Sequence, residues 1–329
     1  MAQLLNDSIP FALLILAVGF VLLIKGADFF VEGSSSIAKK LRIPSIIIGM
    51  TIVAMGTSLP ETAVSITASI ANSNSLAISN VTGSNIFNLM AVIGTCAILT
   101  PVVVQPYVIK RDFPWSIVAA TALLALSFFG NEINRIDGII LLVLFVAFIA
   151  LMISSAQKAR KAGLAETNEA ILAAEEAKIL PLYKCLIFIV GGVAAIIIGG
   201  DFVVDSACAL ALRFGLSETL IGLTIVAIGT SLPELVTSIV AAKKNEVDIA
   251  LGNALGSNVF NIFFVLGIAG TISPVNVIQN NLWDIIILIA FSAIIWLFAS
   301  IRKELKRPVG ILMVLLYLAY MAYIVIRDM

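Results

Sequence analysis

The chain of 329 residues contains no histidine and only three cysteines, Cys96, Cys185 and Cys208. Each cysteine stands alone in an apolar stretch, without the paired spacing of a disulfide framework or a zinc site, so we expect small buried thiols. Zinc and copper prefer imidazole and thiolate ligands, which the sequence does not supply in clusters. Any cation site in this chain should therefore bind a hard cation through oxygen ligands.

Charged residues are also scarce, since they make up 12% of the chain against 60% apolar residues. Soluble domains carry about 25% charged residues, so this composition is typical of a polytopic membrane protein. The 20 basic and 20 acidic residues balance and form no contiguous basic patch, which argues against a nucleic-acid partner. The sequence contains no P-loop, no His-Glu-x-x-His and no nucleophile elbow, so we expect neither an enzyme nor a cofactor.

Ten apolar stretches are long enough to cross a bilayer, which takes about 20 residues of helix. No basic residue precedes the first stretch and no small-residue cleavage pattern follows it, so we expect it to remain as a helix. The sequence thus predicts an all-α polytopic membrane protein with ten transmembrane helices. They lie roughly at residues 8–31, 44–70, 76–100, 112–130, 137–155, 181–211, 216–242, 248–272, 282–300 and 309–326.

The basic residues between these stretches predict the orientation in the cell membrane. Arg135, Arg213 and Arg327 lie on one side, and a much larger set lies in the alternate loops on the other side. Basic residues gather in cytoplasmic loops, so both ends of the chain should face outside the cytoplasm. The larger set consists of Lys39, Lys40, Arg42, Lys110, Arg111, Lys158, Arg160, Lys161, Lys178, Lys184, Lys243, Lys244, Arg302, Lys303, Lys306 and Arg307.

An internal repeat organises the chain. A shift of 173 residues aligns residues 49–61 with 222–234 at 11 of 13 positions, and the same shift aligns 80–88 (NVTGSNIFN) with 253–261 (NALGSNVFN). Each half then contains five helices, and because five is odd the halves must enter the membrane in opposite directions. We predict two inverted five-helix repeats, 1–155 and 181–329, joined by a cytoplasmic linker at 156–180.

The hexapeptide Gly-Thr-Ser-Leu-Pro-Glu occurs at 56–61 and again, unchanged, at 229–234. A carboxylate at membrane depth costs at least about 2.5–3.5 kcal/mol, so Glu61 and Glu234 are candidates for an ion site. Thr57 and Ser58 precede Glu61 by four and three residues, so hydroxyls and carboxylate share one helix face. Thr230 and Ser231 repeat this arrangement before Glu234.

Proline and small polar residues complete the pattern. Pro60 and Pro233 cannot donate a backbone hydrogen bond, so each helix should bend there and leave a carbonyl oxygen free. In the next helix of each half, Gly83 and Gly256 allow close backbone approach. Ser84 with Asn88 and Ser257 with Asn261 again lie four residues apart on one face, listed here together: Ser84, Asn88, Ser257, Asn261.

The ligand count indicates the ion. Two bidentate carboxylates supply four oxygens and the carbonyls at the two breaks supply two more, which falls within the six to eight oxygens that calcium takes. The two negative charges would balance one divalent cation. Calcium is therefore the expected substrate of a site around Glu61 and Glu234.

The duplicated motifs Gly-Thr-Ser-Leu-Pro-Glu and Gly-Ser-Asn-Ile-Phe-Asn resemble the alpha repeats of the calcium/cation antiporter superfamily, most closely its prokaryotic sodium/calcium exchangers. The resemblance covers nearly the whole chain. It implies an antiporter that exchanges sodium for calcium by alternating access, with a monomer sufficient for transport in the lipid bilayer. It also implies roles for the motif residues. Glu61 and Glu234 would bind both ions, Thr57 and Thr230 would offer carbonyls to calcium, and Ala54, Ala227, Ser58, Ser231, Ser84 and Ser257 would line sodium sites.

Two departures bear on the coupling ion. Asn88 matches the family pattern, but Asn261 stands where many exchangers, including potassium-dependent ones, carry Asp, which argues against potassium cotransport. Proton/calcium members usually show Gly-Asn where this chain has Gly-Thr, which favours sodium. A proton/calcium exchanger is the alternative, and a cation channel is a weaker one because it would need no counter-ion.

Several other polar residues lie in or near the apolar stretches. Asn80, Asn85, Asn253 and Asn258 fit helix capping, helix bridging or ion contact equally well. The charged residues near helix ends are expected to snorkel or to pair within their own helix, and they are not assigned to the site. These are Lys25, Asp28, Glu32, Asp201 and Asp205.

Overall fold

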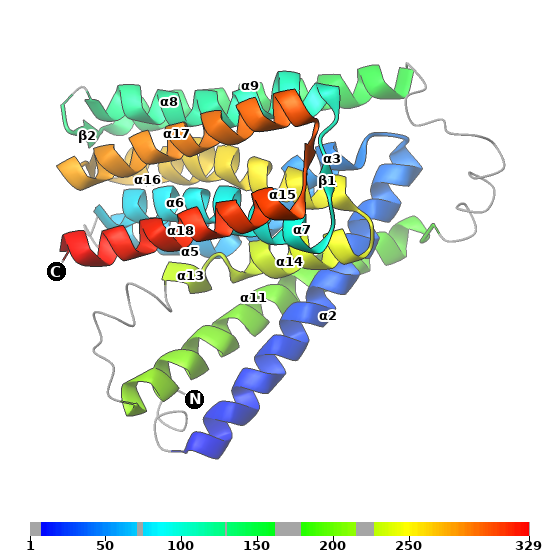
Figure 1. Ribbon diagram of the computed structural model, residues 1–329, viewed down its shortest axis with the longest axis horizontal. Coiled ribbons are helices and arrows are strands. Elements are labelled where there is room, and N and C mark those ends of the chain that lie inside the picture. Colours follow the sequence, from blue (N-terminus) through cyan, green and yellow to red (C-terminus); the bar gives the residue numbers. More distant parts are fainter. Residues whose placement is uncertain (1–7, 71–74, 129, 162–178, 215–226, 329) are drawn as a thin grey trace.

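The computed structural model describes residues 8–70, 75–128, 130–161, 179–214 and 227–328. This part of the chain is a bundle of helices with two very short β-ribbons (Figure 1). In chain order its elements are α2 (Ile9–Leu41), α3 (Ser45–Ile48), η1 (Gly49–Val53), α4 (Ala54–Thr57), α5 (Leu59–Ile70), α6 (Ser75–Phe87), η2 (Asn88–Val92), α7 (Ile93–Leu99), β1 (Val102–Val103), η3 (Val108–Asp112), α8 (Phe113–Phe128), β2 (Glu132–Ile133), α9 (Arg135–Lys161), α11 (Leu182–Arg213), α13 (Ala227–Gly229), α14 (Leu232–Lys243), α15 (Val247–Phe260), η5 (Asn261–Val265), α16 (Leu266–Ile272), β3 (Val275–Asn276), α17 (Gln279–Arg302), β4 (Glu304–Leu305) and α18 (Arg307–Asp328).

Seven described helices are long and apolar enough to cross a membrane, or eight if the bent pair at Ser45–Thr57 and Leu59–Ile70 is one span. Of the ten predicted spans, the one at 112–130 corresponds to α8, which has only 16 residues. The predicted span at 216–242 begins in residues that lie outside the described part, as does most of the predicted linker. Outer helices expose large apolar side chains such as Val143, Val146 and Val190, as expected of a surface that faces lipid.

The first helix is longer than the apolar stretch from which we predicted it. α2 extends to Leu41, ten residues beyond the predicted end at 31, because its small and polar C-terminal part packs against neighbouring helices. Ser8 caps the start by accepting a hydrogen bond from the Phe11 amide at 3.4 Å. Arg42 ends the helix in the left-handed conformation, with φ 54°.

The two hexapeptides break their helices in the same way. Ser58 has φ −85° and ψ 14°, and Ser231 has φ −95° and ψ 6°, so both leave the helical region immediately before Leu-Pro-Glu. The first break bends the span by 48°. The bend predicted from Pro60 is thus present, and the helix restarts at Leu59 so that the proline lies in a first turn, where a missing N–H is tolerated.

The third helix of each half contains a π-helical turn. η2 begins at Asn88 and η5 begins at Asn261, the residue that the repeat aligns with it. A π-turn inserts one extra residue and loosens the backbone hydrogen-bond ladder, and such turns recur at functional sites. The sequence pattern predicted the helix at each of these positions but not the π-turn.

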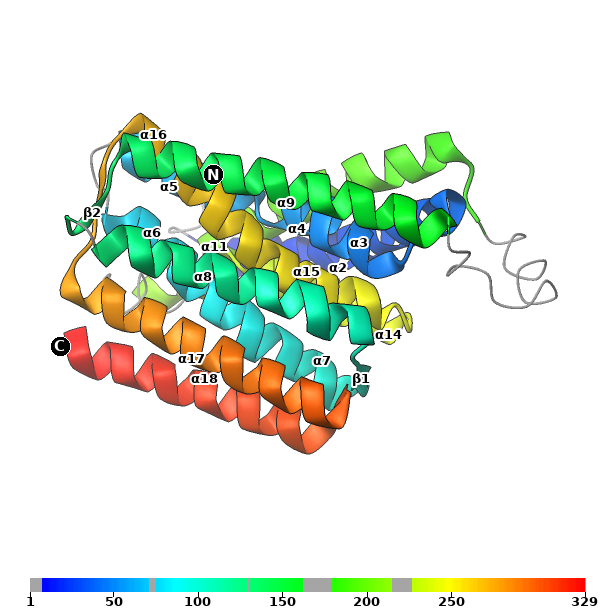
Figure 2. The ribbon, with the colours of Figure 1, turned by 90° about the horizontal axis from the view of Figure 1, so that it is seen from above.

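α15 lies at the centre of the bundle. Every residue from Ile249 to Phe260 is buried, and α15 packs against η1, α3, α4, α8 and α14. Figure 2 shows α17 and α18 along one edge of the bundle and α9 along the opposite edge. Polar residues on α15 are therefore held away from both lipid and water.

The two β-ribbons lie at opposite ends of the bundle (Figure 1). β1 pairs with β4 through Val102 and Leu305, and β3 pairs with β2 through Val275 and Ile133. To within one residue, the shift of 173 converts β1 into β3 and β2 into β4. Each ribbon thus joins one strand from each half of the chain.

α2 and α11 form a tightly crossed pair on one side of the bundle. A Cβ atom built on Gly199 would lie 2.7 Å from the Leu23 nitrogen and 2.8 Å from the Gly19 carbonyl oxygen. Gly26 and Gly192 make an equally close contact, with the Gly192 oxygen 2.9 Å from a Cβ built on Gly26. Small residues allow membrane helices to approach this closely.

We expect Gly199→Ala to destabilise the protein by about 1–3 kcal/mol, because the methyl group meets backbone atoms of α2 that have no room to move. Gly191→Ala is the matched control, since a Cβ at Gly191 on the same helix meets no described atom within 4 Å. Thermal unfolding in detergent checks both variants. A Gly199→Ala protein that melts at the wild-type temperature contradicts the close packing.

Candidate functional site

Glu61 lies fully buried at the start of α5, just after the first helix break. Its Oε1 atom accepts hydrogen bonds from Ser231 Oγ at 3.0 Å and from Ser84 Oγ at 3.3 Å. Its Oε2 atom has no hydrogen-bond partner among the described residues. One carboxylate oxygen is thus anchored and the other is left available.

Glu234 has the same environment in the second half. It is fully buried, and its Oε1 atom accepts a hydrogen bond from Ser58 Oγ at 2.8 Å. Its Oε2 atom also lacks a partner in the described part of the chain. Ser58 of the first motif therefore binds the acid of the second motif, and Ser231 of the second binds Glu61, so the two helix breaks meet face to face.

Two amides hold the residues that follow the breaks. Asn80 Nδ2 lies 3.5 Å from the Glu61 carbonyl oxygen and donates to Ser65 Oγ at 3.2 Å. Asn253 Nδ2 donates to the Glu234 carbonyl oxygen at 3.3 Å and to Ser238 Oγ at 3.0 Å. These amides cap the backbone of α5 and α14, which is one of the three interpretations that the sequence left open for Asn80 and Asn253.

Asn85 and Asn258 link the two middle helices. Asn85 Nδ2 donates to the Asn258 carbonyl oxygen at 3.0 Å, and Asn258 Nδ2 donates to the Asn85 carbonyl oxygen at 3.2 Å. Asn261 Nδ2 donates to Asn85 Oδ1 at 3.2 Å. Here the structure favours helix bridging, because the amides join α6 to α15 directly.

The remaining candidate residues surround this centre. Asn88 is buried, and neither polar atom of its side chain has a partner among the described residues. Ser257 Oγ is also buried without a hydrogen bond in that part, and so is Asn261 Oδ1. Unpartnered buried oxygens are costly, and a bound cation is one way to satisfy them.

The threonines of the two motifs differ. Thr57 is buried, and its hydroxyl lies 2.9 Å from Asn253 Oδ1 and within 3.2 Å and 3.3 Å of the Val53 and Ala54 carbonyls. Thr230 is only half-buried, and its hydroxyl has no partner among the described residues. The Thr57 contact reaches across from the first half of the chain to the second.

The two alanines occupy matching positions at helix starts. Ala54 is buried at the start of α4. Ala227 is the first residue of α13, and its side chain lies outside the described part. The close approach predicted for Gly256 is present, since a Cβ there would lie 2.5 Å from the Met50 Cα. The residue that the repeat places against Gly83 is 223, which also lies outside the described residues.

Ser65 and Ser238 are functional candidates that the sequence analysis missed. Both are buried and both accept a hydrogen bond from the amide that also binds the carbonyl of the central acid. The signal was available, because the shift of 173 residues aligns the two serines with each other four residues after Glu61 and Glu234.

The chemistry of the centre is that of an oxygen site. The described residues contain no group of three or more His, Cys, Asp or Glu side chains that could hold a metal. Two carboxylates with hydroxyl, amide and carbonyl oxygens around them form a ligand set for a hard cation such as calcium. No described lysine or arginine forms an ion pair with Glu61 or Glu234.

Comparison with known proteins agrees with this geometry. A family profile described as "Sodium/calcium exchanger protein" matches residues 11–154 and 184–326. The chain is 33% identical to "Sodium/calcium exchanger MaX1" of Methanosarcina acetivorans, over 94% of this chain and 97% of that protein. It is 36% identical to "Inner membrane protein YrbG" of Escherichia coli, over 79% of each chain.

A solved structure has the same fold. The sodium-calcium exchanger NCX_Mj, soaked with zero Na⁺ and Ca²⁺, superimposes with a TM-score of 0.83 at 29% identity, covering 96% of this chain and 100% of that one. With a family profile that spans most of both halves and a relative that aligns over nearly its whole length, the chain is a multi-pass membrane transporter for cation/calcium antiport, not an enzyme, and it belongs to the sodium/calcium exchanger family.

Proposed function

We propose that this protein exchanges sodium for calcium across the cell membrane by alternating access, without potassium, and that a monomer is sufficient. The observation that carries the proposal is the reciprocal pairing of the two motifs, in which Ser58 binds Glu234 and Ser231 binds Glu61. This pairing leaves one free oxygen on each acid at a shared centre. The name of the relative from Methanosarcina acetivorans supports sodium as the counter-ion.

The proposed ion site uses the predicted residues. Glu61 and Glu234 bind calcium with their free oxygens, and the Thr57 and Thr230 carbonyls complete its coordination. Sodium uses overlapping oxygens, so binding of one ion excludes the other. The flanking sodium ligands are Ala54, Ala227, Ser58, Ser231, Ser84, Ser257, Asn88 and Asn261.

We further propose ten spans arranged as two inverted repeats, 1–155 and 181–329, with the linker 156–180 in the cytoplasm and both ends of the chain outside. η3 and α8 together supply the fourth span, and α13 with α14 supplies part of the seventh. A pseudo-two-fold axis in the membrane plane exchanges every contact between the halves for its partner. Two observations support it, namely the exchanged amide contacts of Asn85 and Asn258 and the exchanged β-ribbons at opposite ends.

Asn253 is proposed as a positioning residue of this site. Its amide donates to Glu234 and Ser238, and its Oδ1 accepts from the Thr57 hydroxyl. The side chain thereby fixes the Thr57 segment, which offers a carbonyl to calcium, relative to the Glu234 carboxylate. Asn80 holds the Glu61 segment in the same way, but no hydrogen bond joins it to Thr230 among the described residues.

A proton/calcium exchanger is the second candidate. Apart from Glu61 and Glu234, no described carboxylate contacts the centre, so a transported proton would have to occupy one of these two acids. A channel is disfavoured because the centre is fully buried, and because a channel conducts without a counter-ion.

Radiocalcium uptake into proteoliposomes tests the coupling ion. We expect uptake when the vesicles contain sodium and none when they contain potassium or choline, because only sodium competes for the same oxygens. Adding potassium to sodium-loaded vesicles should not change the rate. Uptake driven by internal acid would move the protein to proton coupling, and uptake under all conditions would identify a channel.

Glu61→Gln and Glu234→Gln should each lower calcium exchange by about 100-fold or more, since each replaces a charged ligand with a neutral amide at a buried cation site. Glu132→Gln is the control, because Glu132 lies in the short strand β2 at one end of the bundle. Normal exchange by Glu61→Gln, measured with protein of wild-type stability, is incompatible with the proposed site.

Asn253→Ala should raise the calcium concentration for half-maximal exchange more than Asn80→Ala does. Both variants lose an amide that binds a motif carbonyl, at a cost of about 1–3 kcal/mol for the unpaired groups. Only Asn253→Ala also releases Thr57. Equal shifts in the two variants, with equal melting temperatures, would remove the special role of Asn253.

A further inference from the structure

Charged residues join α2 to the connection between α14 and α15 at the face of the bundle that carries most of the basic loops. Lys244 Nζ lies 2.7 Å from Asp28 Oδ1 and 3.5 Å from Glu32 Oε2, and it donates to the Asp28 carbonyl oxygen at 2.9 Å. The sequence analysis expected Asp28 and Glu32 to snorkel or to pair within their own helix. They instead pair with a lysine 216 residues away in the chain.

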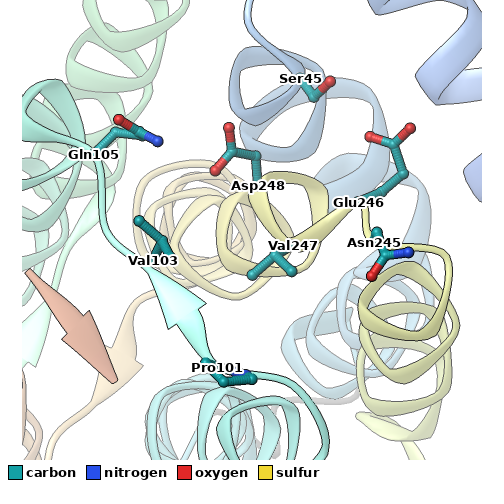
Figure 3. A pocket seen from close by; sticks show the side chains of 8 residues that line it. All are labelled: Ser45, Pro101, Val103, Gln105, Asn245, Glu246, Val247 and Asp248. Carbon is teal, nitrogen blue, oxygen red and sulfur yellow. The ribbon is translucent and has the colours of Figure 1, made fainter. Parts of the chain in front are cut away.

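Glu246 makes the second part of this contact. Its carboxylate accepts a hydrogen bond from Ser35 Oγ, and it lies 3.6 Å from Lys39 Nζ. Figure 3 shows Glu246 and Asp248 pointing toward the side of a pocket on which Ser45 lies. Together these contacts tie two turns of α2 to both sides of the connection, and we call Asp28, Glu32, Ser35, Lys39, Lys244 and Glu246 the charge latch.

The opposite face has the acids of this latch but not its base. The shift of 173 residues converts Asp28 into Asp201 and Glu32 into Asp205 on α11, but it converts Lys244 into Ala71 and Glu246 into Ser73. Residues 71–75 contain no lysine or arginine at all. The ion pair with Lys244 therefore has no equivalent in the other half of the sequence.

Helix packing is unequal in the same sense. α2 packs along α14, whereas among the described residues α11 makes no comparable contact with α5, its repeat equivalent. In Figure 1 the part of α2 near α14 lies against the bundle, and the N-terminal end of α2 and the C-terminal end of α11 extend away from it. The α2–α11 pair is thus closed on the latch face and separated from α5 on the other.

We propose that the charge latch sets the resting conformation of the exchanger by favouring the state in which the ion site is closed to the face that carries Lys244. The inference rests on the proposed function, because alternating access requires α2 and α11 to separate from the bundle on each face in turn. Two equal halves would populate both states equally. An ion-pair network present on one face only stabilises closure there and shifts the population.

Access of a thiol reagent to a cysteine under the latch measures this population directly. Val31 is fully buried and lies three residues after Asp28 and four before Ser35, so it shares their helix face. Val31→Cys would be introduced after Cys96, Cys185 and Cys208 are replaced by alanine. A membrane-impermeant maleimide is then applied from the latch face, with no ion gradient.

Lys244→Met and Glu246→Gln should each raise the labelling rate about two- to fivefold, which is the range that partly exposed ion pairs support. Lys244→Arg should restore the slow rate. Lys243→Met is the matched control, because Lys243 is exposed on the same turn and forms no ion pair with a described residue. Unchanged labelling in both Lys244→Met and Glu246→Gln, or an equal rise in Lys243→Met, overturns the proposal.

The same variants separate this proposal from the proposed function. If both hold, Lys244→Met also lowers, by the same factor, the calcium concentration that half-saturates exchange from the latch face. If labelling rises but sodium-loaded vesicles take up no calcium even with the wild-type protein, the latch holds and the proposed function fails. If exchange is normal and labelling does not change, the proposed function stands without the latch.

Discussion

The burial of two carboxylates at the same point is the constraint on which the rest of this structure depends. Glu61 and Glu234 are fully buried, and no described base pairs with either. Each acid is instead held by a serine from the other half of the chain, with its second oxygen left without a partner in the described part. An uncompensated buried charge costs several kcal/mol, so this arrangement is stable only if protons or cations occupy it. A centre that must be occupied, and whose occupant can change, is the physical requirement for an exchanger.

The helix breaks follow from this constraint. An unbroken helix offers side chains but no backbone oxygens, whereas Ser58 and Ser231 leave the helical region just before each acid. The chain ends that result need new partners, and Asn80 and Asn253 supply them by donating to the carbonyls of Glu61 and Glu234. Because these amides come from the buried helices α6 and α15, the acids are positioned by the most rigid part of the bundle rather than by the breaks themselves.

Much of this could be predicted because the chain states it twice. The repeat shift identified the equivalent acids, the bend and the polar residues of the third helices without any coordinates. It could not identify which hydroxyl binds which acid, since the crossing of Ser58 to Glu234 depends on how two halves meet. It also gave no sign of the π-turns at Asn88 and Asn261, because their residues read as ordinary helix. The length of α2 was underestimated for a related reason, since hydropathy detects contact with lipid and residues 33–41 pack against protein.

The two halves are most alike at the centre and least alike at the periphery, and this difference has a physical meaning. Ion binding must be available from both faces, so the ligands gain from symmetry, and the hexapeptide is unchanged between the repeats. A preference for one face can arise only where symmetry is broken. Lys244 and Glu246 stand where the first repeat has Ala71 and Ser73, far from the ion but at the junction that must open. Since a coupling free energy of 1–2 kcal/mol changes a two-state population by about 5- to 30-fold, a few ion pairs at this junction are enough to decide which side of the membrane the empty site faces.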